Sequence, residues 1–269
     1  MKDRDLLSIK KFSELTGVKE SKLRHYDEVK LFQPAKRGKN GYRYYSVEQI
    51  TAINFINVLH TVKIPIKRIG EIKGNRSPET VLSLLQNQEL ELNKGLMHLQ
   101  QAYSVVHAYC SLIQEGMLAD ESAIRILQMP AMHIEIGTEN DFNSGYIYDS
   151  FFKFLRQMAD RNIDSAFPTG RFYKNMDAFI STPGWPTSFF SVVPTGRDSK
   201  TAGKYLVGYT RGYYGNLGDL PQRMLAYANE HGLAFDGPVY ELYLHNEISI
   251  EHTGNYLIQA SVPIKRREP

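Results

Sequence analysis

The stretch GKNGYRYYS, residues 38–46, places a lysine, an arginine and three tyrosines around an Asn-Gly pair that predicts a tight hairpin turn. Arginine supplies positive charge and a tyrosine hydroxyl donates a hydrogen bond, and both groups suit the phosphates of a nucleic-acid backbone. Strand alternation puts Tyr42 and Tyr44 on one face, and Arg43 and Tyr45 on the other. We therefore predict phosphate contacts for Tyr42, Arg43 and Tyr44, and a place in the core for Tyr45.

Two short helices are predicted before this stretch. Residues 8–16 carry apolar side chains at helical spacing, with Ser8 as the cap and Gly17 as the left-handed residue that ends the helix. A second helix is predicted over about 19–29. Two helices across a glycine-containing turn form a helix-turn-helix pattern, which is a weak signal by itself.

The hairpin and two more helices complete the first part of the chain. Residues 32–45 are predicted to form a two-stranded wing around the Asn-Gly turn. A third helix is predicted from Ser46, with Ser46 as its cap and Gln49 completing a capping box. A fourth helix is predicted from Pro65 to about Lys73, because proline is tolerated in the first turn.

Charge divides the chain into a basic front and an acidic remainder. The overall net charge is +3, but residues 1–76 hold 17 Lys/Arg against 8 Asp/Glu, which leaves 15 against 21 for the rest. This asymmetry indicates that only the front meets a polyanion. The one cysteine, Cys110, allows no disulfide within the chain, and no apolar run approaches the ~20 residues of a membrane span. A cytoplasmic protein without a thiolate-rich metal site is expected.

A long helix with one apolar seam is predicted over residues 77–116. Positions alternating by three and four residues, nine of ten of them apolar, are Leu82, Leu85, Glu89, Leu92, Leu96, Leu99, Tyr103, Val106, Cys110 and Ile113. Such a repeat over more than four heptads is typical of a coiled coil, which predicts dimerisation through this helix. The alternative is a long helix that packs on its own domain.

Residues 121–269 contain an internal repeat. The first half runs through AMHIEIG, DSFFKFLRQMADRN, SAFPTGRFYK and SFFSVVP, and the second through KYLVGYTRG, LPQRMLAYANEHG, LAFDGPVYELYL and YLIQASVP. Each half reads strand–helix–strand–strand. Two such units predict an α+β module with pseudo-twofold symmetry and a cleft between its halves.

The first 75 residues resemble the MerR family of transcriptional regulators. The resemblance is carried by SKLRHYDEVKLFQP followed by GYRYYSVEQI, and it departs from the family pattern at His25, where the family has tyrosine. It implies a winged helix-turn-helix DNA-binding domain over 1–76, with the second helix in the major groove. The residues then expected at DNA, besides those of the wing, are Lys19, Ser21, Lys22, Arg24, His25, Tyr26 and Lys67.

The rest of the chain is similar to the GyrI-like effector modules of BmrR-type multidrug-sensing activators. The match centres on Val239-Tyr240-Glu241-Leu242, where the family's glutamate lies in an aromatic pocket and pairs with lipophilic cations. A desolvated carboxylate needs such a cation or a proton. The predicted pocket walls are Tyr148, Phe151, Phe167, Phe172, Trp185, Phe190, Tyr209 and Tyr243, with Trp185 as a lid. Glu135 is a rival carboxylate.

The resemblance implies a homodimeric activator without catalytic residues, cofactor or metal. Antiparallel pairing of the long helix would present two heads to a pseudopalindromic promoter. Distortion of the promoter spacer would then let RNA polymerase read both promoter elements. Two alternatives stay open for the C-terminal module: a hydrolase of a small electrophile, and an interaction domain without a ligand. A metal or redox sensor is disfavoured because one cysteine cannot form a metal cluster.

Overall fold

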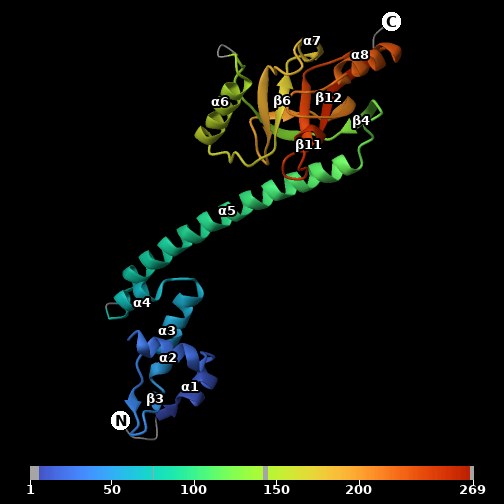
Figure 1. Ribbon diagram of the computed structural model, residues 1–269. Helices are drawn as coiled ribbons and strands as arrows, with labels where there is room; N and C mark the ends of the chain where they lie inside the picture. Colours follow the sequence, from blue (N-terminus) through green and yellow to red (C-terminus); the bar gives the residue numbers. More distant parts are fainter. Residues whose placement is uncertain (1–5, 75, 142–144, 267–269) are drawn as a thin grey trace. The chain divides into compact units, whose positions relative to one another are not determined.

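The computed structural model describes residues 6–74, 76–141 and 145–266 (Figure 1). The chain forms two compact units, divided between His98 and Leu99. This boundary lies inside one continuous helix, α5 (Pro78–Met117).

The N-terminal unit is a small helical domain with a three-stranded sheet. Its elements are β1 (Leu6–Ser8), α1 (Ile9–Thr16), α2 (Glu20–Glu28), β2 (Lys36–Arg37), β3 (Arg43–Ser46), α3 (Gln49–Thr61) and α4 (Ile66–Lys73). Ser8 caps α1 by accepting a hydrogen bond from the amide of Lys11, and Gly17 ends the helix at φ 68°. Both predictions for the first helix are confirmed.

The wing differs from its prediction in two details. The sheet has the order β1-β3-β2, so the N-terminal strand β1, which the sequence did not reveal, pairs with the wing. Ser46 ends β3 opposite Leu6, and α3 begins at Gln49 with Glu48 as its cap. The prediction that Ser46 caps the third helix was therefore wrong. Only one arm of the capping box exists, in which the Ser46 amide donates to Gln49 Oε1 at 3.0 Å.

An aromatic stack forms the centre of the N-terminal unit. The Tyr45 ring lies 4.7 Å from Phe12 and 5.6 Å from Phe32, measured between ring centroids, and the latter pair is nearly parallel at 3°. Ile53 and Ile56 of α3 are fully buried in the same core. The prediction that Tyr45 is a core residue is confirmed.

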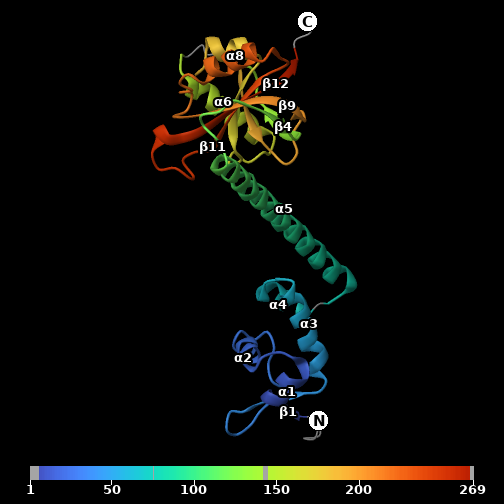
Figure 2. The same cartoon turned by 90° about the vertical axis from the view of Figure 1, so that its right-hand side faces the viewer.

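Helix α5, which Figure 2 shows as one continuous helix, carries apolar side chains that are exposed in the single chain. The exposed seam residues are Leu82, Leu85, Leu92, Leu96, Leu99, Tyr103 and Val106, and Cys110 is also exposed. By contrast, Leu112 near the end of the helix is buried against the C-terminal unit. Pairing through the seam stays a prediction.

The C-terminal unit is built on a curled antiparallel sheet. Its strands are β4 (Arg125–Met129), β5 (Met132–Ile136), β6 (Thr169–Tyr173), β7 (Ser188–Val192), β8 (Asp198–Lys200), β9 (Gly203–Gly212), β10 (Leu233–Phe235), β11 (Val239–His245) and β12 (Tyr256–Arg266). Its helices are α6 (Ile147–Asp160), α7 (Met176–Ser181) and α8 (Leu220–Glu230), besides the end of α5.

The strand order is symmetric about the pair β11 and β6. The path β9-β12-β11 on one side is mirrored by β5-β7-β6 on the other, with β4 and β8 added at the two ends. Both halves therefore have the strand–helix–strand–strand order that the repeat predicted. The strands β4, β8 and β10 and the short helix α7 were not predicted, because segments of three to six residues carry little periodicity.

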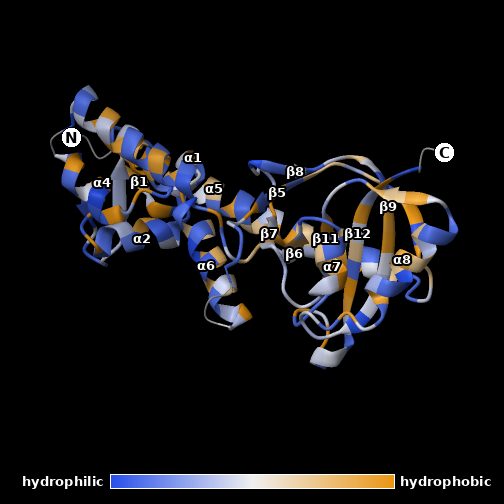
Figure 3. Ribbon diagram, turned by 90° about the horizontal axis from the view of Figure 1, so that it is seen from above, coloured by the Kyte–Doolittle hydropathy of each residue, from blue (hydrophilic) through white to orange (hydrophobic). Residues whose placement is uncertain are grey.

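The two faces of this sheet have separate cores. Helices α7 and α8 pack on one face against residues such as Val239 and Ile258, and α6 packs on the same side against Phe189. Leu112 of α5 joins the other face, with Tyr240 and Leu242. Hydrophobic residues dominate β9 and β12 in Figure 3, because the sheet is covered on both faces there.

A buried lysine lies in the second of these cores. Lys200 is 4% exposed, its Nζ donates to Ser261 Oγ at 2.7 Å, and the rings of Tyr205 and Tyr240 lie 4.7 and 5.1 Å from it. Burial lowers the pKa of Lys200 from 10.5 to about 8. Between these two pH values the unfolded chain binds more protons than the folded one, so folding stability should rise with pH across this window.

We expect the Lys200→Met variant to lose this dependence of folding stability on pH. Methionine has no charge to desolvate, so wild-type protein should gain stability relative to the variant, by up to about 3 kcal/mol, between pH 7.5 and 10. Urea denaturation followed by the fluorescence of Trp185, the one tryptophan, reports on this unit. A difference between the two proteins that does not change with pH would contradict the expectation.

Candidate functional site

The exposed surface of α2 carries most of the residues predicted to contact DNA. Lys19, Ser21, Arg24 and His25 are exposed, and so is Lys67 on α4. Arg24 forms an ion pair with Glu20 one turn earlier, at 2.8 Å. Lys22 is half-buried, and its Nζ donates to Asn57 Oδ1 of α3 at 3.2 Å.

Tyr26 is not on this surface. Its side chain is 0% exposed and lies edge-on to His60 at 6.2 Å between centroids, and burial raises the pKa of its hydroxyl. The prediction of a phosphate contact was therefore wrong for Tyr26. The spacing already contained the reason, because Tyr26 follows the core residue Leu23 by three positions on one helix face.

A buried carboxylate joins α2 to the wing. Asp27 Oδ2 accepts from Arg37 Nη2 at 2.5 Å and from Arg43 Nε at 2.7 Å. Arg43 is thus oriented by a carboxylate of the protein itself, and its predicted phosphate contact stays a prediction. We call the three side chains the wing clasp. Tyr42 remains exposed and Tyr44 is half-buried, so Tyr42 is the more accessible of the two.

An aromatic cavity of about 380 Å³ lies in the C-terminal unit. Its walls come from α5, α6, β6, β7, the turn after β9 and the end of β11. The lining residues are Tyr109, Ile147, Tyr148, Phe151, Phe152, Leu155, Ser165, Phe167, Thr169, Gly170, Arg171, Phe189, Tyr213, Tyr214, Tyr243, Asn246 and Glu247. Of the eight predicted aromatic walls, Tyr148, Phe151, Phe167 and Tyr243 are among them.

The other four predicted walls lie elsewhere. Phe172, Phe190 and Tyr209 belong to the opposite face of the sheet, where both phenylalanines pack edge-on against Tyr240. Strand alternation causes this, because Phe172 follows the cavity residue Arg171 by one position. Trp185 is 40% exposed in a turn and does not line the cavity, so the predicted lid is not seen.

Glu241 is buried beneath the cavity rather than open to it. It is 0% exposed and does not line the cavity. Its carboxylate accepts hydrogen bonds from the hydroxyls of Tyr173, at 2.9 Å, and of Tyr243. Arg171 Nε lies 3.8 Å away as its ion-pair partner. Within the protein, Arg171 already compensates the charge of Glu241, and the predicted pairing of Glu241 with an external cation stays a prediction.

Arg171 and Tyr173 were missed by the sequence prediction. The antiparallel register places Arg171 directly opposite Glu241, and Tyr173 opposite Val239. The repeat contained the signal, because GRFY and VYEL occupy equivalent strands of the two halves. Burial and then Glu241 raise the pKa of Tyr173, so its hydroxyl stays a hydrogen-bond donor.

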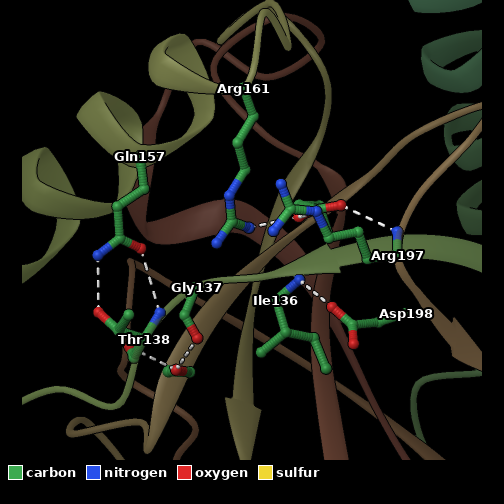
Figure 4. A network of polar contacts seen from close by, with 9 residues as sticks. Ile136, Gly137, Thr138, Gln157, Arg161, Arg197 and Asp198 are labelled. Carbon is green, nitrogen blue, oxygen red and sulfur yellow. Dashed lines mark hydrogen bonds and ion pairs between the residues drawn. The ribbon is translucent and has the colours of Figure 1, made fainter.

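The rival carboxylate, Glu135, is also compensated internally. It is buried, accepts from the amide of Arg197 at 3.0 Å, and pairs with Arg161, the residue that follows α6 (Figure 4). Nearby, Gln157 of α6 hydrogen-bonds both the amide and the hydroxyl of Thr138. These contacts fix the end of α6 to β5, and Glu135 does not line the aromatic cavity.

Neither a metal-binding cluster nor a membrane-spanning helix is found in the described part of the chain. Residues 6–74, 76–141 and 145–266 contain no group of three His, Cys, Asp or Glu side chains that could hold a metal ion. Within the same residues, no helix combines the length and the apolar character that crossing a bilayer requires.

Known proteins resemble this chain at both ends. The family model of the MerR HTH family regulatory protein matches residues 7–74. The multidrug-efflux transporter 2 regulator of Bacillus subtilis (strain 168) is 24% identical over 262 residues, which cover 94% of each chain. The multidrug-efflux transporter 1 regulator of the same organism is 25% identical over 282 residues, covering 96% of this chain and 97% of its own.

A solved structure, the cryo-EM structure of an EcmrR–DNA complex, covers 97% of this chain and 100% of its own, at 15% identity and a TM-score of 0.39. Both Bacillus relatives are regulators of multidrug-efflux transporters.

The wing clasp predicts a local loss of order when its carboxylate is neutralised. Asp27→Asn should weaken the ion pairs to Arg37 and Arg43 and destabilise the wing by about 1–2 kcal/mol, allowing for the exposure of both arginines. Amide hydrogen exchange at Gly38 and Tyr44 measures the effect. Glu28→Gln, at the exposed neighbouring position, is the matched control. Equal protection of the wing in both variants would contradict the clasp.

Proposed function

We propose that this chain, which belongs to the MerR family of transcriptional regulators and is related to multidrug-efflux regulators, activates transcription when a lipophilic, cationic small molecule binds its aromatic cavity. The cavity carries the proposal. At about 380 Å³ it falls within the ~300–1,000 Å³ typical of small-molecule sites, and aromatic rings dominate its walls. The mixture of rings and few charges suits a lipophilic aromatic cation.

Contacts of α5 support a link between the cavity and the DNA-binding unit. Tyr109 of α5 lines the cavity together with Asn246, which follows β11. One turn later, the carbonyl oxygen of Ile113 forms a hydrogen bond with His245 Nε2 at 3.1 Å. A ligand that displaces Tyr109 therefore acts directly on the helix that runs into the other unit. A differential contact of this kind is what allows a ligand to shift a conformational equilibrium.

The exposed seam of α5 supports a homodimer. Seven apolar side chains on one stripe of a helix are an unpartnered surface in the single chain, and an antiparallel pair of α5 helices would bury them. Two DNA-binding units would then face a pseudopalindromic promoter. Ligand binding would change how the dimer distorts the promoter spacer for RNA polymerase.

We expect Phe151→Ala to weaken ligand binding selectively. Phe151 lines the cavity and is half-buried, so loss of its ring should reduce affinity for tetraphenylphosphonium by about tenfold. Phe172→Ala removes an equally half-buried ring on the opposite face and should leave affinity unchanged. Calorimetric titration of both variants measures this, and a wild-type protein that binds no aromatic probe at all would refute the proposed function.

Dimerisation through α5 gives a second expectation. Leu96→Lys places a charge in the seam and should raise the dimer dissociation constant by about tenfold or more, because a buried ammonium must be desolvated. Leu90→Lys makes the same change at an exposed leucine outside the seam. Sedimentation equilibrium compares the two variants. Equal weakening by both, or by neither, would count against pairing along the seam.

A further inference from the structure

We propose that Glu247, rather than Glu241, is the carboxylate that selects a positively charged effector. This inference rests on the proposed function and names the residue that gives the cavity its charge preference. Three features of the C-terminal unit carry it: the closed state of Glu241, the open state of Glu247, and the tyrosines around Glu247.

Glu241 lacks the means to receive a cation. Its oxygens accept two tyrosine hydroxyls and lie beside Arg171, so the group as a whole is close to neutral. A ligand cation would have to displace Arg171, which is itself buried and donates from Nη1 to the carbonyl of Gly184 at 3.0 Å. A displaced guanidinium would remain unpaired in a desolvated site, at a cost of several kcal/mol. Arg171 therefore keeps Glu241 out of ligand binding.

Unlike the buried Glu241, Glu247 is accessible to a ligand in the cavity. It lines the cavity on the loop that follows β11, and its side chain is exposed. Oε2 accepts a hydrogen bond from the hydroxyl of Tyr214, which orients the carboxylate. Among the described residues, Glu247 forms no ion pair, so its negative charge is uncompensated. Arg171 and Glu247 are the two charged residues of the lining, and Arg171 is already paired.

Tyrosine rings surround the position that a cation would occupy. Tyr213 and Tyr214 lie 5.2 Å apart at 65°, and Tyr214 lies 4.6 Å from Tyr243, all measured between centroids. Tyr148 and Tyr213 also line the cavity. Burial and then Glu247 raise the pKa values of Tyr214 and Tyr256. Tyrosine rings beside a carboxylate are the combination of groups that attracts organic cations.

The cavity therefore has two chemically different ends. Phe151, Phe167 and Phe189 provide an apolar slot for aromatic groups. Tyr213, Tyr214 and Glu247 provide the end that favours positive charge. A delocalised aromatic cation would place its rings in the first and its charge near the second, without disturbing the ion pair of Glu241.

The test compares a cation with a neutral molecule of similar shape. Tetraphenylphosphonium and triphenylphosphine oxide are titrated into the full-length wild-type protein, Glu247→Gln and Glu251→Gln. Glu251 is an exposed carboxylate four residues further along that does not line the cavity, so its variant controls for net charge. We expect Glu247→Gln to weaken phosphonium binding by about tenfold. Binding of the oxide, and phosphonium binding by Glu251→Gln, should not change.

Failure of this inference differs from failure of the proposed function. Unchanged phosphonium binding by Glu247→Gln would overturn the inference alone, as would equal weakening by Glu251→Gln, which would mark a long-range charge effect. An equal loss for both probes would show that Glu247 shapes the cavity instead of selecting charge. Wild-type protein that binds neither probe would overturn both. Because Glu247 is exposed, its variant should keep the wild-type melting temperature, which confirms folding.

Discussion

The ion pair of Arg171 and Glu241 is the constraint on which the C-terminal unit depends. It joins β6 to β11, the two strands at which the halves of the sheet meet. A buried carboxylate and a buried guanidinium each lose several kcal/mol of hydration, and they persist only if each satisfies the other. A slip of the strands by one residue would turn Glu241 to the opposite face of the sheet, away from Arg171. The pair therefore specifies register more than it adds stability.

The same physical solution recurs at two other places. Asp27 binds two arginines of the wing, and Glu135 binds Arg161 and Arg197. In each case a buried carboxylate forms ion pairs with arginines that belong to other segments of the chain. The arginine fork suits this role because it offers several donors from a planar, always charged group. Such pairs orient a wing, the end of α6 and the halves of the sheet.

The pairing of Glu241 with Arg171 also determines the charge of the cavity. Since Glu241 is closed beneath it, the cavity floor contributes little net charge, and the walls are rings. Selection of a charged ligand then depends on Glu247, because solvent stabilises this exposed, unpaired carboxylate at low cost. Tyr109 adds a wall from α5, so cavity occupancy and helix position are physically connected.

The sequence by itself determined the elements and their order. Ser8 and Gly17 marked the ends of α1 through local capping, Tyr45 was assigned to the core by alternation, and the repeat revealed the two halves of the sheet. These features depend on neighbours within a few residues, or on internal similarity. The charge of Glu241 and the position of Arg43 depended instead on partners 70 and 16 residues away in the chain, Arg171 and Asp27. Only the tertiary structure decided whether those charges were free, because compensation of a buried charge is a property of what packs against it.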